Sequence, residues 1–146
     1  MTILLATLEG VAADRRVASA EHRFRPAIKV VRGDGIVAGF CGDNTACAKA
    51  MAAVRGGETD PQALAEICDG VAVTPRGVYD LSAKLASRAP KREPFIANGS
   101  GWCEAQAFLR GRGRWRPADL RDAVRYVGSV RLDCGNGCDW LPLNPR

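Results

Sequence analysis

The chain has 146 residues, of which 47% are hydrophobic and 25% are charged, and a net charge of +5 that comes mainly from arginine. This composition excludes a disordered, collagen-like or coiled-coil protein, and the length is sufficient for a core without disulfides. The apolar runs are too short to cross a bilayer, and no export signal is recognisable near Met1. We therefore expect one cytoplasmic domain that spans residues 1–146.

The first part of the chain predicts two β-hairpins, because apolar segments alternate with short turns that contain glycine. One hairpin is expected over residues 2–19 with its turn at 8–10, and the other over residues 27–42 with Asp34 and Gly35 in the turn. Later strands are expected over residues 70–82, around a Pro-Arg-Gly turn, over residues 94–101, and in a last hairpin over residues 130–143 that turns at Asn136 and Gly137.

Four segments predict helices from their apolar spacing and their capping residues. They are residues 45–55 with Asp43 or Asn44 as the cap, a short helix at 59–68 opened by Asp60 and Pro61, and residues 101–111 and 117–129. Blocks of strands and blocks of helices alternate along the chain. This order favours an α+β fold with antiparallel sheets covered by helices.

The cysteines and the arginine cluster leave alternatives open. We expect the six cysteines to be mostly reduced core residues, but Cys134 and Cys138 flank Gly-Asn-Gly and would form a redox-labile pair or half of a zinc site if they faced each other. We predict no metal and no cofactor, and we expect the single histidine, His22, in a loop. The segment RGRGRWRP at 110–117 is either a solvated loop or a phosphate-binding patch with Trp115 for stacking.

Several motifs together resemble the proteasome β-subunit family, most closely its bacterial HslV-type branch. They are, in chain order, MTILLA, ADRRV, KVVRGDGIVAGFCGDNTA and IANGSGWCEAQAFL. The resemblance implies a four-layer αββα sandwich of the N-terminal nucleophile hydrolases, here with a shortened second helix.

The resemblance also implies that Thr2 is the nucleophile once Met1 is removed. A terminal threonine carries its own base, since an α-amino group has a pKa of about 8. The family places its threonine about four residues farther from the aspartate than Thr2 is from Asp14. Because shortening a hairpin by an even number of residues preserves which side chains face each other, we expect Thr2 rather than Met1 in this position, facing Asp14.

The other site residues follow from the same motifs. Asp14 and Lys29 resemble the acidic and basic partners of the nucleophile, and Ser100 resembles the serine that binds the terminal amine. Gly42 resembles the glycine whose amide binds the oxyanion, and Phe40 falls at the substrate pocket or in the core. Asp122 and Ser129 are candidates for the last two partners of the family's site.

The function predicted on this basis is that of a threonine peptidase, active as a homo-oligomeric ring on peptides or unfolded proteins and assisted by an ATP-dependent unfoldase. Two alternatives stay open. One is a catalytically inactive assembly protein of the same fold, which would need no free Thr2, and the other is a basic nucleic-acid-binding module built on residues 110–117.

Overall fold

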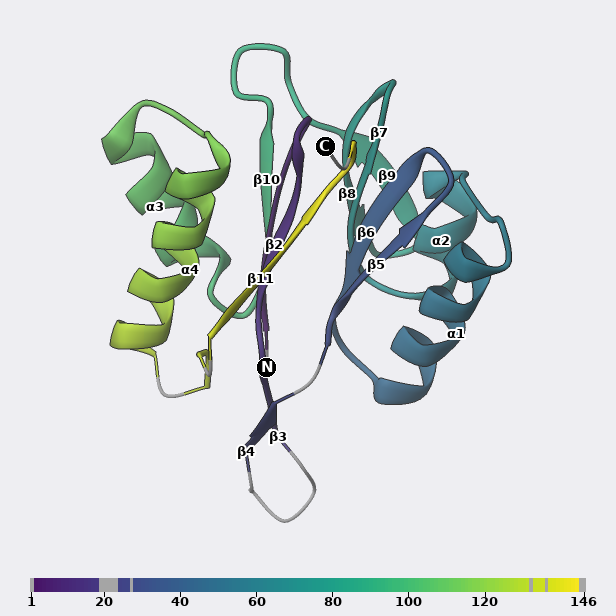
Figure 1. Ribbon diagram of the computed structural model, residues 1–146, viewed down its shortest axis with the longest axis horizontal. Helices are drawn as coiled ribbons and strands as arrows, with labels where there is room; N and C mark the ends of the chain where they lie inside the picture. The colour runs from purple at the N-terminus through teal and green to yellow at the C-terminus, as the bar shows by residue number, and fades with distance from the viewer. Residues whose placement is uncertain (1, 19–23, 27, 132, 136, 145–146) are drawn as a thin grey trace.

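The computed structural model describes residues 2–18, 24–26, 28–131, 133–135 and 137–144. Met1, His22 and Asn136, to which predictions were attached above, lie outside these residues. The predicted combination of antiparallel sheets and helices is confirmed, and Figure 1 shows two sheets side by side with helices on the outer face of each.

The first sheet contains the chain's amino-terminal strand at an inner position. Its order is β10–β1–β2–β11, with all neighbours antiparallel, and its strands are β1 (Ile3–Thr7), β2 (Gly10–Asp14), β10 (Phe95–Gly99) and β11 (Cys138–Pro142). The first predicted hairpin is confirmed as β1–β2. Pairing of Ile3 with Gly99 brings the residue before β1 next to the residue after β10.

The second sheet is built by consecutive neighbours along the chain. Its order is β5–β6–β7–β8–β9, with strands β5 (Val30–Gly33), β6 (Ile36–Phe40), β7 (Gly70–Thr74), β8 (Gly77–Ser82) and β9 (Leu85–Arg88). The second predicted hairpin is β5–β6, and the strands expected around Pro-Arg-Gly are β7 and β8. The edge strand β9 was not predicted.

All four predicted helices are present, and each begins close to the expected residue. They are α1 (Asn44–Arg55), α2 (Pro61–Ile67), α3 (Trp102–Arg112) and α4 (Pro117–Val130). Asp43 caps α1 by accepting a hydrogen bond from the Ala46 amide, and Asp60 caps α2 through the Gln62 amide. Within the described residues, no helix combines the length and the hydropathy needed to cross a membrane.

Three buried clusters hold these elements together. One lies between the first sheet and α3 and α4, and includes Leu5, Leu109 and Leu120. Another lies between the second sheet and α1 and α2, and the third lies between the two sheets, where Leu4 of β1 belongs to the same cluster as Val37 of β6. The alternation of Leu4 and Leu5 between two clusters is the period of two expected of a strand covered on both faces.

Two expectations about strands are wrong. The segment 11–19 is not one strand, because β2 ends at Asp14 and β3 (Arg16–Ala18) pairs with β4 (Phe24–Pro26) in a separate sheet. The last hairpin is not seen either, since the described residues between α4 and β11 include no strand. β11 pairs with the edge of β2 instead, and the Gly135 oxygen accepts a hydrogen bond at 3.0 Å from the amide of Arg15, the residue after β2.

The alternatives considered for Cys134 and Cys138, a redox-labile pair or half of a zinc site, depended on that hairpin. Cys134 is instead buried beneath α4, and Cys138 lies opposite Asp14 in the β2–β11 ladder. All six cysteines, each of them among the described residues, are free thiols.

Candidate active site

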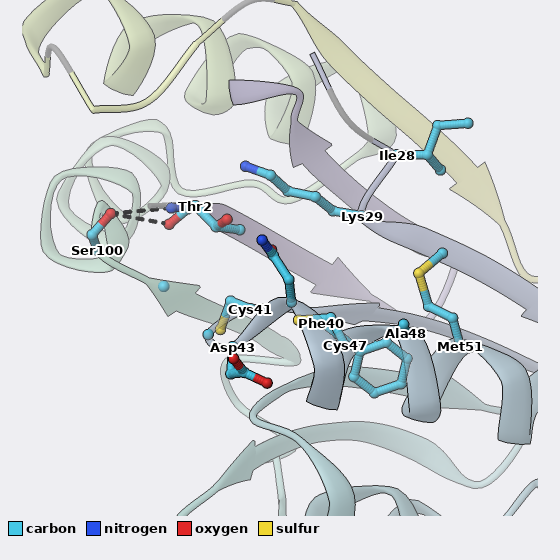
Figure 2. A pocket seen from close by; sticks show the side chains of 13 residues that line it. Thr2, Ile28, Lys29, Phe40, Cys41, Asp43, Cys47, Ala48, Met51 and Ser100 are labelled. Carbon is cyan, nitrogen blue, oxygen red and sulfur yellow. Dashed lines mark hydrogen bonds between the residues drawn. The ribbon is translucent and has the colours of Figure 1, made fainter. Parts of the chain in front are cut away.

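Thr2 lies at the point where β1 and β10 meet. Its side chain is buried, with 7% exposed, and its backbone nitrogen donates to Ser100 Oγ at 3.3 Å. The Ser100 hydroxyl in turn reaches the Thr2 carbonyl oxygen at 3.3 Å, and both contacts are drawn in Figure 2. Ser100 therefore contacts both the backbone nitrogen and the carbonyl oxygen of Thr2, the residue before β1.

Asp14 and Lys29 form a buried ion pair next to Thr2. The Lys29 ammonium donates to Asp14 Oδ1 at 2.7 Å, and both side chains are at least 95% buried, with 5% of Lys29 and none of Asp14 exposed. Asp14 also accepts from two backbone amides, Ile3 N and Gly135 N, each at 2.9 Å. Burial lowers the pKa of Lys29 from its ordinary value, and the hydrogen bond and charge of Asp14 oppose that shift.

The register of the β1–β2 hairpin differs by one residue from the expectation. Leu4 lies opposite Ala13, so the residue opposite Asp14 is Ile3 and not Thr2, in agreement with the bond from the Ile3 amide to the Asp14 carboxylate. The prediction that Thr2 directly faces Asp14 is therefore wrong. Thr2 instead shares the face of Leu4, which is turned toward the second sheet and toward Lys29.

A cavity of about 650 Å³ brings five of the six predicted site residues together. Thr2, Lys29, Phe40, Gly42 and Ser100 all line it. In Figure 2 the Lys29 side chain extends toward Thr2. The sixth residue, Asp14, does not line the cavity but accepts a hydrogen bond from Lys29, which does.

The first turn of α1 and the segment before it form the opposite wall. Gly42 has a φ of +108°, which L side chains rarely adopt, and no described residue accepts a hydrogen bond from its amide. Phe40 is only 2% exposed, belongs to the core under α1 and also lines the cavity. Apolar side chains complete the wall: Ile28, Ala48 and Met51.

Gly99 is a site residue that the sequence did not reveal. Its φ is +91°, and a Cβ atom placed on it would lie 2.1 Å from the Thr2 carbonyl oxygen. Only glycine lets the end of β10 approach Thr2 this closely. The sequence signal was the NGS triplet, but glycine in such a triplet is also common in ordinary turns.

The acidic neighbour of Ser100 is Asp133. Its pKa is lowered to about 2, chiefly by the Arg131 guanidinium, which bonds both carboxylate oxygens, and to a lesser degree by the Ser100 hydroxyl. The candidates named from sequence do not line the cavity: Asp122 pairs with Arg125, and Ser129 donates to the Tyr126 carbonyl.

The arginine-rich segment is held by carboxylates. Arg110 pairs with Glu93 at 2.7 Å, while three further arginines surround Asp119, which is 1% exposed: Arg112, Arg114 and Arg116. Trp115 packs on Phe95, with ring centroids 5.4 Å apart. These contacts favour the surface-loop interpretation over a phosphate-binding patch.

Solved structures of HslV and of HslV-like proteins are similar to the chain over nearly its whole length. Eukaryotic HslV from Trypanosoma brucei has a TM-score of 0.72 at 18% identity, over 96% of this chain and 98% of that one. Thiobacillus denitrificans BPH in complex with epoxomicin has a TM-score of 0.74 at 16% identity, over 99% and 100% of the two chains. Anbu, an ancestral β-subunit from Yersinia bercovieri, has a TM-score of 0.71 at 11% identity, over 97% and 81%.

No protein-family model and no curated protein matches the sequence, so the likeness is one of structure. The similarity covers 96% of this chain for HslV and agrees with the resemblance noted in the sequence motifs. The chain therefore has the fold that is seen in HslV and in the HslV-like proteins BPH and Anbu.

Proposed function

We propose that the chain is a threonine peptidase subunit, a hydrolase that cleaves peptide bonds through an acyl-enzyme ester on Thr2 after removal of Met1. The observation that carries this proposal is the position of Thr2, whose nitrogen is bonded to Ser100 at the wall of a cavity that Lys29 and Gly42 also line. After Met1 is removed, that nitrogen becomes a free α-amine beside the hydroxyl of the same residue.

The reaction then needs only groups that already lie at the cavity. The Thr2 hydroxyl attacks the substrate carbonyl carbon, and its proton passes to the α-amine directly or through the Ser100 hydroxyl. The Gly42 amide donates to the oxyanion, a contribution of about 3 kcal/mol to transition-state binding. The amine returns the proton to the leaving nitrogen, and water hydrolyses the ester by the same groups in reverse.

The buried ion pair sets the protonation state of the amine. A lysine cation close to an amine disfavours the protonated form of that amine, so a larger fraction is neutral and able to accept a proton. Asp14 opposes the effect of burial on the Lys29 pKa and so keeps the lysine charged. Asp14 is thus a positioning residue, which acts on the reaction through Lys29.

The cavity wall suggests the class of substrate. Phe40, Ala48 and Met51 offer apolar surface next to Thr2, which fits an apolar side chain before the bond that is cleaved. BPH, which has a similar fold, was solved in complex with epoxomicin, so an epoxyketone of this kind is the appropriate probe.

Hydrolysis of peptides with apolar residues tests the proposal. Thr2→Ala removes the hydroxyl but should keep the free α-amine, because alanine is also small enough to allow removal of Met1. We expect Thr2→Ala to abolish turnover and Thr2→Ser to retain part of the activity. Thr59→Ala, at an exposed threonine before α2, is the matched control and should cleave at the wild-type rate. Full activity of Thr2→Ala would disprove the mechanism, and retention of Met1 in an inactive protein would favour the assembly protein.

We further propose that residues 1–146 form one domain, a four-layer αββα sandwich with a shortened second helix. It would act in the cytoplasm as a homo-oligomeric ring, served by an ATP-dependent unfoldase. The mass of the purified protein, measured by light scattering, tests the ring, and a monomer would contradict it.

A further inference from the structure

Two thiols are in contact beside the cavity. Cys47 of α1 and Cys68, the residue that follows α2, have sulfur atoms 3.5 Å apart, although they are 21 residues apart in the chain. Cys68 is buried, with 6% exposed, whereas Cys47 lines the cavity. A disulfide has a sulfur–sulfur bond of about 2.05 Å, so a shift of about 1.5 Å would close the pair.

Cys68 also holds the peptide group that carries the Gly42 amide. Its thiol donates to the Cys41 carbonyl oxygen at 3.3 Å. The Cys41 carbonyl and the Gly42 N–H belong to one planar peptide unit, so a contact that fixes the oxygen also fixes the direction of the N–H. The Cys68 thiol therefore orients the donor that we assign to the oxyanion.

The two sulfur atoms differ in reactivity. The pKa of Cys47 is lowered, chiefly because Cys68 donates a hydrogen bond to its thiolate, with a smaller contribution from Lys29. The pKa of Cys68 is raised by the same interaction and by burial. Either sulfur can be the donor, so Cys68 can turn its proton from the Cys41 carbonyl to Cys47 when Cys47 ionises. Cys47 is then the attacking sulfur and Cys68 the resolving one.

We propose that Cys47 and Cys68 form a reversible redox switch that responds to hydroperoxides and controls the Gly42 amide. Cys47 thiolate attacks a peroxide oxygen, the O–O bond breaks, and the departing oxygen takes a proton and leaves as water or an alcohol. Cys68 then attacks the resulting sulfenic acid; the S–S bond forms, the S–O bond breaks, and the hydroxyl leaves as water with the Cys68 proton. The thiols lose two electrons and the peroxide gains them, and a dithiol reductant reverses the change.

Oxidation changes the cavity in two ways. The disulfide has no S–H, so the Cys41 carbonyl loses its donor and the peptide unit that carries the Gly42 N–H is released. The Cys47 side chain is also drawn from the cavity wall toward Cys68. The consequence for Thr2 rests on the proposed function, whereas the disulfide and the loosening of residues 41–42 do not.

The experiment uses full-length protein with Cys103→Ser, which removes the exposed thiol of α3. After treatment with hydrogen peroxide, peptide mapping should find Cys47 linked to Cys68, and amide hydrogen exchange should be faster over residues 40–46. Peptide turnover should fall about tenfold or more and return with dithiothreitol, which does not reduce methionine sulfoxide at Met51.

Cys68→Ser in the same background is the matched variant. It keeps a hydroxyl donor for the Cys41 carbonyl but cannot form the disulfide, so its turnover, relative to its own untreated rate, should not respond reversibly to peroxide. Absence of the Cys47–Cys68 link, or a link without faster exchange at 40–46, would overturn the proposal. A reduced protein without turnover and without an epoxyketone adduct would refute the proposed function instead, while the mapping and exchange would still decide on the switch.

Discussion

Replacing Asp14 by asparagine should destabilise the protein by about 3–5 kcal/mol, because it removes the carboxylate charge from a buried ion pair and leaves the Lys29 ammonium in place. The estimate rests on the burial of both partners, 0% and 5% exposed, and on their 2.7 Å separation. Asparagine retains an acceptor for the Ile3 or the Gly135 amide, which favours the lower end of the range. Since domains are typically stable by about 5–15 kcal/mol, this loss is readily measured.

Urea denaturation followed by tryptophan fluorescence is the suitable assay. Asp139→Asn is the matched control, because Asp139 also pairs with a basic residue, Arg15. The Arg15 side chain is 49% exposed, so we expect a much smaller change in the free energy of unfolding. Adding Lys29→Met to Asp14→Asn should recover part of the loss, because it removes the buried ammonium as well. Equal losses in Asp14→Asn and Asp139→Asn would refute the reasoning.

Three further predictions follow from the surroundings of Thr2. Gly99→Ala should lower epoxyketone labelling of Thr2 at least about tenfold, because the new Cβ would collide with the Thr2 carbonyl. Gly57→Ala is the control: Gly57 has a φ of +103°, but no atom of the described residues lies within 4 Å of the new Cβ. This variant should lower stability and leave labelling unchanged. Ser100→Ala should slow labelling by about 10²-fold with little change in urea stability, and an unchanged labelling rate would exclude its role in proton transfer. The pKa of Asp133 is about 2 in the folded state, against an ordinary value of 3.8. The ionised carboxylate therefore stabilises the fold above pH 3.8, and this contribution is lost as the pH falls toward 2. In thermal melts, Asp133→Asn should lose less stability than the wild type between pH 3.8 and pH 2.

Local signals in the sequence were sufficient to predict most of the helices and strands. Asp43 and Asp60 as caps and Pro61 at a first helical position predicted where α1 and α2 begin, and Gly35 predicted the β5–β6 turn. Each of these signals acts within a few residues of its effect, so tertiary contacts are not needed to interpret it.

The errors arose where contacts between residues far apart in the sequence determine the structure. The turn between β8 and β9 has positive φ at Ala83 and Lys84, residue types that give no turn signal, so β9 was missed. The pairing of β11 with β2 depends on an open sheet edge that only the assembled fold offers. The one-residue difference at Asp14 is an error of parity, because Asp14 lies opposite Ile3 and a shift of one residue puts Thr2 on the other face of the sheet.

The candidate site likewise contains some residues that sequence motifs predict and others that only the structure reveals. The sequence motifs predicted Thr2, Lys29 and Ser100 as site residues, and all three line one cavity. The contact between Cys47 and Cys68 brings together residues from separate helical segments, and the approach of Gly99 to Thr2 joins residues that are far apart in the chain. No local pattern encodes such distances, so only the structure reveals them.

Mass spectrometry of the purified protein after incubation with an epoxyketone tests the central claim most directly, since this probe reacts with a terminal hydroxyl and amine together. The account predicts a chain that lacks Met1 and carries one adduct on Thr2, and no adduct in Thr2→Ala. A chain that has lost Met1, is folded by circular dichroism and yet takes up no probe would contradict it.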